Sequence, residues 1–462
     1  MLVSYIKKMY NRLMGSNFAR SVMTLSSGTI ISQVINFVGM PVLGRIYTPA
    51  AVGDYSLVVS NAGVISALAS LGMMSVFLLP EKDDESKALC RLVTVFTLAI
   101  TLVSVIFLEL ISPFFKVFSA ENASYETCLV ILFFYIIANT VYSICYAYTN
   151  RQKQYKVMFV SPIVLVLGNI ISGILFGLLG WEFIGYSLSH ILSLGLASLH
   201  LMYNANPYGK LSSREYTYSA LLKKYKKFPC YQMPANLISN IGIQIPNLMI
   251  THFFSSAVLG MYSMAMKILS IPTTLLSTPI NRVYFREASE RYNRGENIGE
   301  FSFNILQTGI KIALIPMLFL VLFGEELFSL FLGKQWYTAG TFAAVLVLYQ
   351  LVHFCYSCLS GHFIIIRKNH FNLFLSFYDV LSSLALYFLV QSLNISIIPC
   401  LLALSIIKIS GIIIFQGIFL KMTGFEIKRY FLFVLKIIAL PTFLAWAIRY
   451  LIKEIWLVNL LI

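Results

Sequence analysis

The sequence alternates between long apolar runs, each of roughly 20 residues, and short polar breaks along nearly its whole length. A run of this length is what an α-helix needs to cross the apolar core of a bilayer. Hydrophobic residues make up 58% of the chain and charged residues only 11%, whereas soluble domains carry about 25% charged residues. We therefore predict an all-α integral membrane protein with many crossings. Continuous apolar runs exclude a β-barrel, whose strands alternate apolar and polar residues.

The apolar runs predict twelve core membrane-spanning helices in two sets of six. A further apolar stretch at 431–448 forms a C-terminal addition whose topology the sequence leaves open, and 455–462 is too short to cross alone. The longest outer loop is expected around Gly324 to Thr338, so no large extramembrane domain is available for chemistry. The expected helices are residues 21–44, 52–79, 89–111, 126–148, 157–179, 182–203, 229–254, 257–281, 303–323, 339–366, 371–391 and 395–420.

The chain repeats short phrases at a long interval. Residues 53–57 read GDYSL and residues 260–264 read GMYSM, and each phrase opens a long apolar run. Two further short phrases recur in the same order. The acidic one is at 109–112 and 326–329, and the basic one is at 151–153 and 367–368. Such a long period predicts two related lobes instead of a solenoid. The predicted organisation is a six-helix lobe at 1–204, a basic linker at 205–228, a second six-helix lobe at 229–421 and an extra hydrophobic segment at 422–462.

Lysine and arginine residues are distributed unevenly between the two sides of the predicted helices. With the N-terminus placed in the cytoplasm, the inner segments hold 25 Lys and Arg residues, and the outer segments hold three, which are Arg45, Lys116 and Lys334. This bias follows the positive-inside rule, so we expect a multi-pass protein with a cytoplasmic N-terminus. The net charge of +15 then reflects topology and contact with anionic membrane lipids, and does not indicate nucleic-acid binding.

The linker between the lobes carries an amphipathic pattern. Tyr218, Leu221, Leu222 and Tyr225 fall at helical spacing, with four lysines around them. This pattern describes a helix that lies on the membrane surface with its apolar face in lipid. A solvated basic linker is the second interpretation, and the sequence leaves both open.

Ionisable residues within apolar runs are costly, so they usually face an interior cavity and mark a functional site. Lys267, Lys408 and Lys311 are the basic residues of this kind in the second lobe, and Asp379 is the acidic one. A cavity with surplus positive charge favours an anionic substrate. For Lys267 the alternative is a structural pairing with Asp379 or a carbonyl group, and Lys311 is close enough to a helix end to reach the interface. Asp379 either pairs with Lys408 or carries a proton during transport.

Three further features point to a wet, mobile interior. Lys267 lies five residues before Pro272, where a proline inside a helix removes a backbone hydrogen bond and bends the chain. Arg45 closes the first helix at the outer interface, where it can line a cavity. A polar stripe on one face of the seventh helix either binds helices together or wets a cavity, and four polar residues favour the cavity. These residues are Asn236, Asn240, Gln244 and Asn247.

The sequence predicts no cofactor. The histidines, cysteines and carboxylates do not form a cluster with metal-ligand spacing, and the chain has no glycine-rich phosphate loop of the kind that binds ATP. The seven cysteines lie mostly within helices, where ordinary packing explains them. No catalytic residue is predicted.

Three segments together resemble a known family. Residues 43–49 (LGRIYTP) with the following 52–55 (VGDY) look like the first-loop signature of bacterial polysaccharide flippases, which belong to the multidrug/oligosaccharidyl-lipid/polysaccharide exporter superfamily. Residues 258–262 through Lys267 resemble the family's junction between helices seven and eight, and 323–336 resemble its loop between helices nine and ten. The similarity extends over roughly residues 20–420.

This resemblance implies two six-helix bundles in a pseudo-twofold arrangement, as in multidrug exporters of the superfamily. It also implies a flippase for undecaprenyl-pyrophosphate-linked oligosaccharide repeat units in the bacterial inner membrane, acting in O-antigen or other surface polysaccharide synthesis. The polysaccharide polymerase and chain-length machinery would be its protein partners. Tyr47 and Trp336 are candidates for contacting the sugar.

Lys267 occupies the place where the related lipid II flippases have an arginine. Lysine keeps the positive charge but loses the bidentate fork. The chain has fewer arginines in its first two helices than those flippases, which argues against a peptidoglycan precursor as cargo.

Two rival functions remain on sequence alone. A drug or cation antiporter of the same superfamily would share the fold, but it should hold acidic residues in its cavity, and here the deep basic residues outnumber Asp379. A membrane polysaccharide polymerase or ligase is the enzymatic alternative. Such enzymes generally need a long outer loop with catalytic groups, which this chain lacks.

Overall fold

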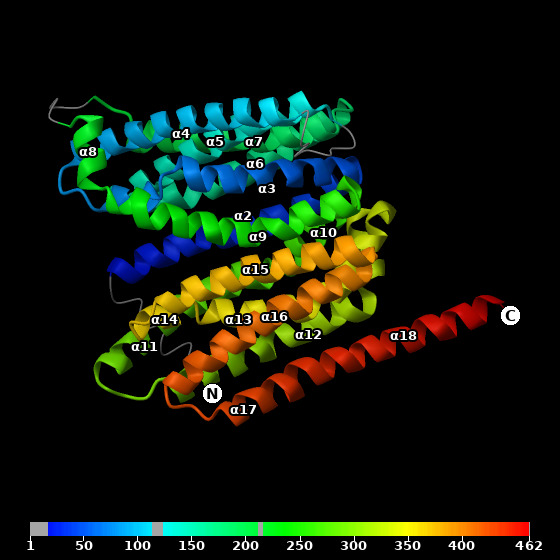
Figure 1. Ribbon diagram of the computed structural model, residues 1–462. Helices are drawn as coiled ribbons and strands as arrows, with labels where there is room; N and C mark the ends of the chain where they lie inside the picture. The colour runs from blue at the N-terminus through cyan, green and yellow to red at the C-terminus, as the bar shows by residue number, and fades with distance from the viewer. Residues whose placement is uncertain (1–16, 113–122, 211–215, 462) are drawn as a thin grey trace. The chain divides into compact units, whose positions relative to one another are not determined.

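The computed structural model describes residues 17–112, 123–210 and 216–461, and within these ranges the chain is helical, without β-strands. Twelve of the described helical segments are long and apolar enough to cross a membrane (Figure 1). The prediction of an all-α, multi-pass membrane protein is therefore confirmed.

These twelve helical segments are not the same twelve that the sequence predicted, and they differ at two places. The seventh predicted helix forms as α9 (Met233–Phe253), but its polar residues keep it out of the set of apolar spans, although it is 21 residues long. The C-terminal stretch Ile427–Leu451 belongs to the set instead. Among the described residues, thirteen helical segments are thus long enough to cross a bilayer.

The contacts of the chain divide it into two compact units. The first comprises residues up to Tyr47 together with Val58–Leu237, and the second comprises Thr48–Leu57 together with Ile238–Ile462. The predicted linker at 205–228 packs within the first unit, and the segment after residue 421 packs within the second.

The first unit contains the helices of the N-terminal half, except for residues 48–57, which belong to the second unit. Glycines let two of them approach closely: a methyl group on Gly28 would lie 2.6 Å from the carbonyl oxygen of Phe159, and one on Gly39 would lie 2.3 Å from the side chain of Ile170. Small residues at helix crossings are the usual way in which membrane helices pack. The elements are α2 (Asn17–Ile46), α3 (Pro49–Ala69), η1 (Met73–Leu78), α4 (Asp83–Ile111), α5 (Tyr125–Arg151), α6 (Tyr155–Leu178), α7 (Phe183–Ala205), α8 (Tyr218–Lys224) and η2 (Phe228–Gln232).

The amphipathic linker helix α8 packs part of its apolar face on protein, an arrangement that neither interpretation from sequence included. Leu221 and Tyr225 are buried in a core cluster that also includes residues of η1, α4 and α5. The Lys224 ammonium pairs with Glu85 at 2.5 Å, and the Tyr225 hydroxyl donates to the same carboxylate at 3.0 Å. The sequence pattern located the apolar face, and the first unit covers Leu221 and Tyr225 of it, while Tyr218 is exposed.

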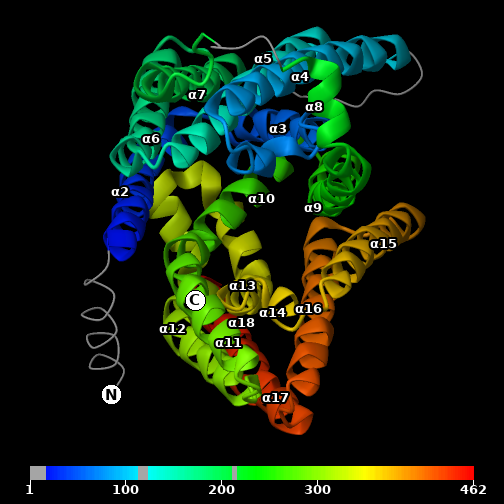
Figure 2. The ribbon, with the colours of Figure 1, turned by 90° about the vertical axis from the view of Figure 1, so that its left-hand side faces the viewer.

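The second unit is built around α13, which is the most deeply buried of the apolar spans. Helices α12 and α16 pack along it, and α15 and α16 lie side by side (Figures 1 and 2). Its elements are α9, α10 (Ser256–Leu269), η3 (Thr273–Ser277), α11 (Thr278–Asn293), α12 (Gly299–Leu332), η4 (Lys334–Trp336), α13 (Tyr337–Cys358), α14 (His362–Ile365), α15 (His370–Leu393), α16 (Ile397–Met422), α17 (Ile427–Phe433), η5 (Val434–Ala439) and α18 (Leu440–Leu461).

The predicted outer loop around Gly324 to Thr338 is mostly helical. Helix α12 continues to Leu332, with non-helical backbone angles at Phe323, and only the short turn η4 separates it from α13. Gly324 and Gly340 allow the two helices to meet, since a methyl group on Gly340 would lie 2.3 Å from the Gly324 carbonyl oxygen. Glu325 is buried between the two helices, whereas Glu326, Lys334 and Gln335 are exposed.

Candidate functional site

A break in the helix that follows α9 organises the candidate site. Helix α10 ends at Leu269, Pro272 precedes the wide turn η3, and α11 begins at Thr278. Proline has no backbone N–H and cannot complete the helical ladder, and η3 is a π-helical turn of the kind often found at functional positions. The bend predicted at Pro272 is thus observed as an interruption in the middle of the 38-residue span Ser256–Asn293.

Lys267 lies in the last turn of α10, directly before this break. Its side chain is half-buried, and no hydrogen bond or ion pair to it is found within the described ranges. The C-terminal end of a helix carries a partial negative charge and free carbonyl groups, which stabilise a nearby cation. Lys267 lies at such a helix end, and among the described residues its ammonium has no acidic partner that would compete with an anion.

A buried glutamine holds the break in place. Gln350 on α13 is 2% exposed, and its side-chain nitrogen donates to the Thr273 hydroxyl at 3.2 Å. Thr273 is the first residue of η3, so this bond connects the broken helix to the central helix of the unit. Sequence reasoning missed Gln350, although a lone amide in the apolar run of α13 is a signal, because a buried amide needs a partner.

Lys408 and Asp379 form an ion pair. The Lys408 ammonium lies 3.0 Å from the Asp379 carboxylate and 3.4 Å from the Gly242 carbonyl oxygen. One lysine of α16 thus connects α15 and α9. The position of Gly242 needs a small residue, since a methyl group there would lie 3.2 Å from the side chain of Val380 and 3.3 Å from that of Asp379. Of the alternatives left open by the sequence, the pairing of Asp379 with Lys408 is the one observed.

The four predicted polar residues of α9 are half-buried: Asn236, Asn240, Gln244 and Asn247. Along the helix, the Asn247 amide donates to Gln244 at 3.1 Å, and the Gln232 amide donates to Asn236 at 2.9 Å. Asn236 belongs to the first unit, while Asn240, Gln244 and Asn247 belong to the second. These amides therefore bond partly to each other along one helix.

The remaining predicted basic residues are exposed. Lys311 on α12 is exposed, as expected for a lysine that reaches toward the interface. Arg45 ends α2 in the first unit and is also exposed. Within the second unit the structure therefore brings Lys408, Asp379 and α9 together, and leaves Lys267 as a separate half-buried cation.

The two aromatic residues expected to contact sugar are part of the protein interior. Tyr47 is 1% exposed, and its hydroxyl donates to the Gly173 carbonyl oxygen at 2.7 Å. Trp336 is 0% exposed. Both are too deeply packed to meet a ligand, so that expectation is wrong. Their position at predicted outer loops suggested exposure, but the adjoining helices close over both side chains.

The described residues contain no group of three or more His, Cys, Asp or Glu side chains that could hold a metal ion. The cysteines are free, and all except Cys230 are buried. The chemistry of the site therefore consists of one available ammonium, one ion pair and a row of amides.

The family model for "Polysaccharide biosynthesis protein" matches residues 42–340, which is more than half of the chain. The chain belongs to this polysaccharide biosynthesis family. The match includes α9, the helix break and Lys267, and confirms the family resemblance drawn from residues 43–55 and 258–267. A comparison with the sequences of curated proteins gives no match.

Solved membrane transporters share the fold of this family member. The lipid II flippase MurJ in an inward closed conformation has 15% sequence identity and a TM-score of 0.67, over 94% of this chain and 100% of that chain. A MATE multidrug resistance transporter of the MOP superfamily in its inward-facing conformation has 14% identity and a TM-score of 0.58, over 88% of this chain and 99% of that chain. An outward-facing MATE structure has 14% identity and a TM-score of 0.55, over 90% and 98%. At these identities the likeness concerns the fold.

Proposed function

We propose that this protein is a flippase that moves undecaprenyl-pyrophosphate-linked oligosaccharide repeat units from the cytoplasmic to the periplasmic or outer leaflet, for O-antigen or other surface polysaccharide synthesis. Membership of the polysaccharide biosynthesis family supports the pathway, and the transporter fold supports movement of a substrate across the membrane. Surface-polysaccharide polymerase and chain-length proteins are the partners that this pathway implies. The proposed location is the bacterial inner membrane, with the N-terminus in the cytoplasm as the positive charge bias predicts.

The observation that carries the proposal is Lys267 beside the helix break, whose ammonium has no acidic partner in the described part of the chain. A pyrophosphate group carries several negative oxygens, and an ammonium without an acidic partner gains a charge-assisted hydrogen bond when such an oxygen arrives. Lys408 contributes less to this attraction because Asp379 already neutralises it. Lys267 is thus the proposed primary contact to the pyrophosphate. Arg45 and Lys311 are further basic residues proposed to attract it.

The amides of α9 are proposed to contact the sugar. Asn240, Gln244 and Asn247 offer donors and acceptors on a half-buried helix face, and amides exchange hydrogen bonds with hydroxyl groups without a charge preference. The prenyl chain would remain in lipid. Transport would follow alternating access, in which an inverted or duplicated pair of bundles exposes a substrate to each side in turn.

Asp379 is the proposed coupling residue. Its pair with Lys408 connects three helices of the second unit, and protonation of the carboxylate would weaken that connection. A proton gradient could act on the second unit in this way. The cation antiporter alternative is less well supported, because Asp379 is occupied by Lys408 and therefore offers little attraction to a cationic drug.

Reconstitution tests the proposal directly. Purified protein in lipid vesicles is expected to move a fluorescent polyprenyl-diphosphate-linked oligosaccharide between leaflets, whereas Lys267→Ala removes this activity. Lys436→Ala is the matched control, since Lys436 is an exposed lysine in another membrane-spanning segment. Transport of cationic dyes without transport of the lipid would favour the antiporter, and lengthening of the oligosaccharide would favour the polymerase.

A further inference from the structure

The C-terminal segment (Ile427–Leu451) consists of α17, η5 and the first part of α18, and it contacts α12 near both of its ends. At the beginning of the segment, the Arg429 guanidinium lies 2.7 Å from Glu300, in the first turn of α12. The same guanidinium lies over the rings of Phe303 and Phe425, at 5.3 Å and 5.5 Å from their centroids. This end of the C-terminal segment is therefore next to the start of α12.

The loops on that side also meet. A methyl group on Gly299 would lie 2.8 Å from the Thr423 carbonyl oxygen, and one on Gly424 would lie 2.5 Å from the Asn297 side chain. The end of α16, the start of α12 and the start of α17 thus share one side of the second unit.

The other end of the C-terminal segment contacts the far end of α12. Arg449 on α18 pairs with Glu325 at 2.8 Å and donates to the Val321 carbonyl oxygen at 2.7 Å. Glu325 also accepts hydrogen bonds from Thr341 at 2.5 Å and from Tyr337 at 3.3 Å. Both charged residues are buried, at 5% and 3% exposure. The Arg449–Glu325 pair is therefore buried from solvent, whereas the Arg429–Glu300 pair at the beginning of the segment is exposed.

Neighbouring contacts fix the same end. The Trp446 indole donates to the Ala344 carbonyl oxygen at 3.1 Å, and the Arg449 guanidinium lies 5.2 Å from the centre of the Trp446 ring. Arg449 is thus held by a carboxylate, a carbonyl and an aromatic face. A guanidinium in an apolar region needs this degree of compensation, because an unpaired charge there is costly.

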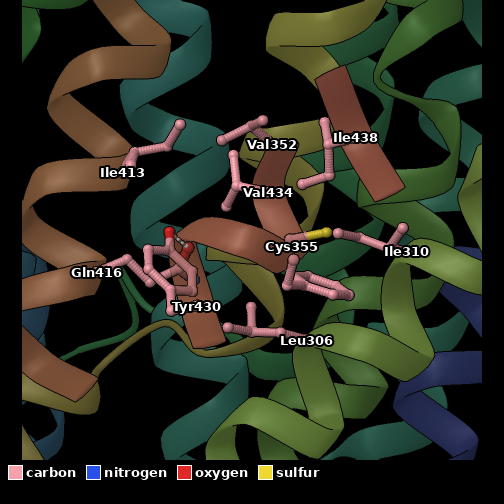
Figure 3. A pocket seen from close by; sticks show the side chains of 10 residues that line it. Leu306, Ile310, Val352, Cys355, Ile413, Gln416, Tyr430, Val434 and Ile438 are labelled. Carbon is pink, nitrogen blue, oxygen red and sulfur yellow. Dashed lines mark hydrogen bonds between the residues drawn. The ribbon is translucent and has the colours of Figure 1, made fainter. Parts of the chain in front are cut away.

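The middle of the C-terminal segment packs closely on the unit. A cavity of only about 10 Å³ remains between η5, α12, α13 and α16, which is room for about one water molecule. Figure 3 shows its lining, with the Tyr430 hydroxyl directed at Gln416. That hydrogen bond measures 2.8 Å and joins α17 to α16. The C-terminal segment is therefore seated on the unit along its length.

The distances fit a complete membrane crossing. From Arg429 to Arg449 an ideal helix rises about 30 Å, and from Glu300 to Glu325 it rises about 37 Å. The apolar core of a bilayer is about 30 Å thick. The C-terminal segment thus runs parallel to α12, from the side where α12 starts to the side where it ends.

We infer that the C-terminal segment is a thirteenth transmembrane crossing, and that the buried Arg449–Glu325 pair locks its far end against α12. Because the segment crosses the membrane once, the end of α18 lies on the side opposite to the loop between α16 and α17. With the proposed cytoplasmic N-terminus, the end of α18 is outside the cytoplasm. This inference does not depend on the proposed cargo.

Cysteine labelling in the full chain tests the crossing. In a Cys230→Ser background, which removes the exposed native cysteine, one variant carries Lys428→Cys and another carries a cysteine appended after Ile462. A membrane-impermeant thiol reagent is expected to label the appended cysteine in intact spheroplasts, and Lys428→Cys only after permeabilisation. Labelling of both from one side overturns the thirteenth crossing, while an exchange of the two sides keeps it and refutes the proposed orientation.

A charge exchange tests the lock. Arg449→Glu alone is expected to lower the amount of folded protein, because it places two buried carboxylates side by side, and addition of Glu325→Arg is expected to restore it. Lys428→Glu, at an exposed position of the same segment, is the matched control and should have no effect. Failure of the double variant to recover, with the crossing intact by labelling, refutes the lock.

Discussion

Gly53 and Gly260 pack against each other through their main chains. A methyl group on Gly53 would lie 1.7 Å from the Ser256 carbonyl oxygen, and one on Gly260 would lie 1.9 Å from the Pro49 carbonyl oxygen. Residues 48–57 accordingly belong to the second compact unit. The two glycines are also the first residues of the duplicated phrase in the sequence, so the internal repeat marks the place where its two copies touch.

Substitution of either glycine tests this crossing. Gly53→Ala or Gly260→Ala forces the two main chains apart, and we expect a destabilisation of about 1–3 kcal/mol or more, the usual cost of overpacking. Thermal unfolding of the purified protein, followed by size-exclusion chromatography, measures the effect. Gly195→Ala is the control, because a methyl group at that membrane-helix glycine meets nothing within 4 Å. Equal unfolding temperatures for all three variants would contradict the close crossing.

Removal of one partner of the Lys408–Asp379 pair should destabilise the protein. Asp379→Ala leaves the Lys408 ammonium, whose side chain is 12% exposed, without its carboxylate. We expect a loss of roughly 2–4 kcal/mol, somewhat below the value for fully buried pairs because Asp379 is 33% exposed. Denaturant or thermal unfolding in detergent measures this.

The double variant Asp379→Leu with Lys408→Met provides the control for that prediction. It removes both charges and should recover most of the lost stability, since a buried pair can often be replaced by apolar residues. Additive losses in the double variant would show that the two residues are not coupled.

The contact of α8 with Glu85 should persist through the physiological pH range. The hydrogen bond to Glu85 raises the pKa of the Lys224 ammonium, and burial followed by the same carboxylate raises the pKa of Tyr225. A raised lysine pKa means that its contribution is fully present below the ordinary value of about 10.5 and is lost as pH rises through the folded-state pKa. Trypsin cleavage of the linker should therefore stay slow between about pH 7 and 9.

Glu85→Ala should remove this protection at every pH in that range, because both partners lose the carboxylate. The measurement is the rate of trypsin cleavage after Lys226 and Lys227. Lys223→Ala is the control, since the structure gives Lys223 no role in this contact. Slow cleavage in Glu85→Ala would mean that Leu221 and Tyr225 alone hold α8.

The sequence was sufficient for most of the helices and for the position of the helix break beside Lys267. Apolar runs locate crossing helices because length and hydrophobicity are local properties, and Pro272 located the break beside Lys267. The α9 amides were also visible, although they removed that helix from the set of apolar spans. These features depend on residues close together in the chain.

The ion-pair partners of charged residues could not be predicted from the sequence, because the partners are distant along the chain. Arg449 and Glu325 are 124 positions apart, and the pairing of Asp379 with Lys408 is visible only in their 3.0 Å contact. The docking of α8 was missed for the same reason, since an amphipathic pattern shows an apolar face but not what covers it. Tyr47 and Trp336 were misjudged because the ends of helices in this protein are closed by neighbouring helices.

The central claim is that Lys267 is an available cation for the pyrophosphate of a lipid-linked oligosaccharide. The most direct measurement is the affinity of the purified protein for a polyprenyl-diphosphate-linked oligosaccharide, compared among wild type, Lys267→Arg, Lys267→Met and the control Lys436→Met. We expect Lys267→Met to weaken binding about 10- to 100-fold, the loss of one charged hydrogen bond, with Lys267→Arg and Lys436→Met close to wild type. Unchanged affinity in Lys267→Met would contradict the claim.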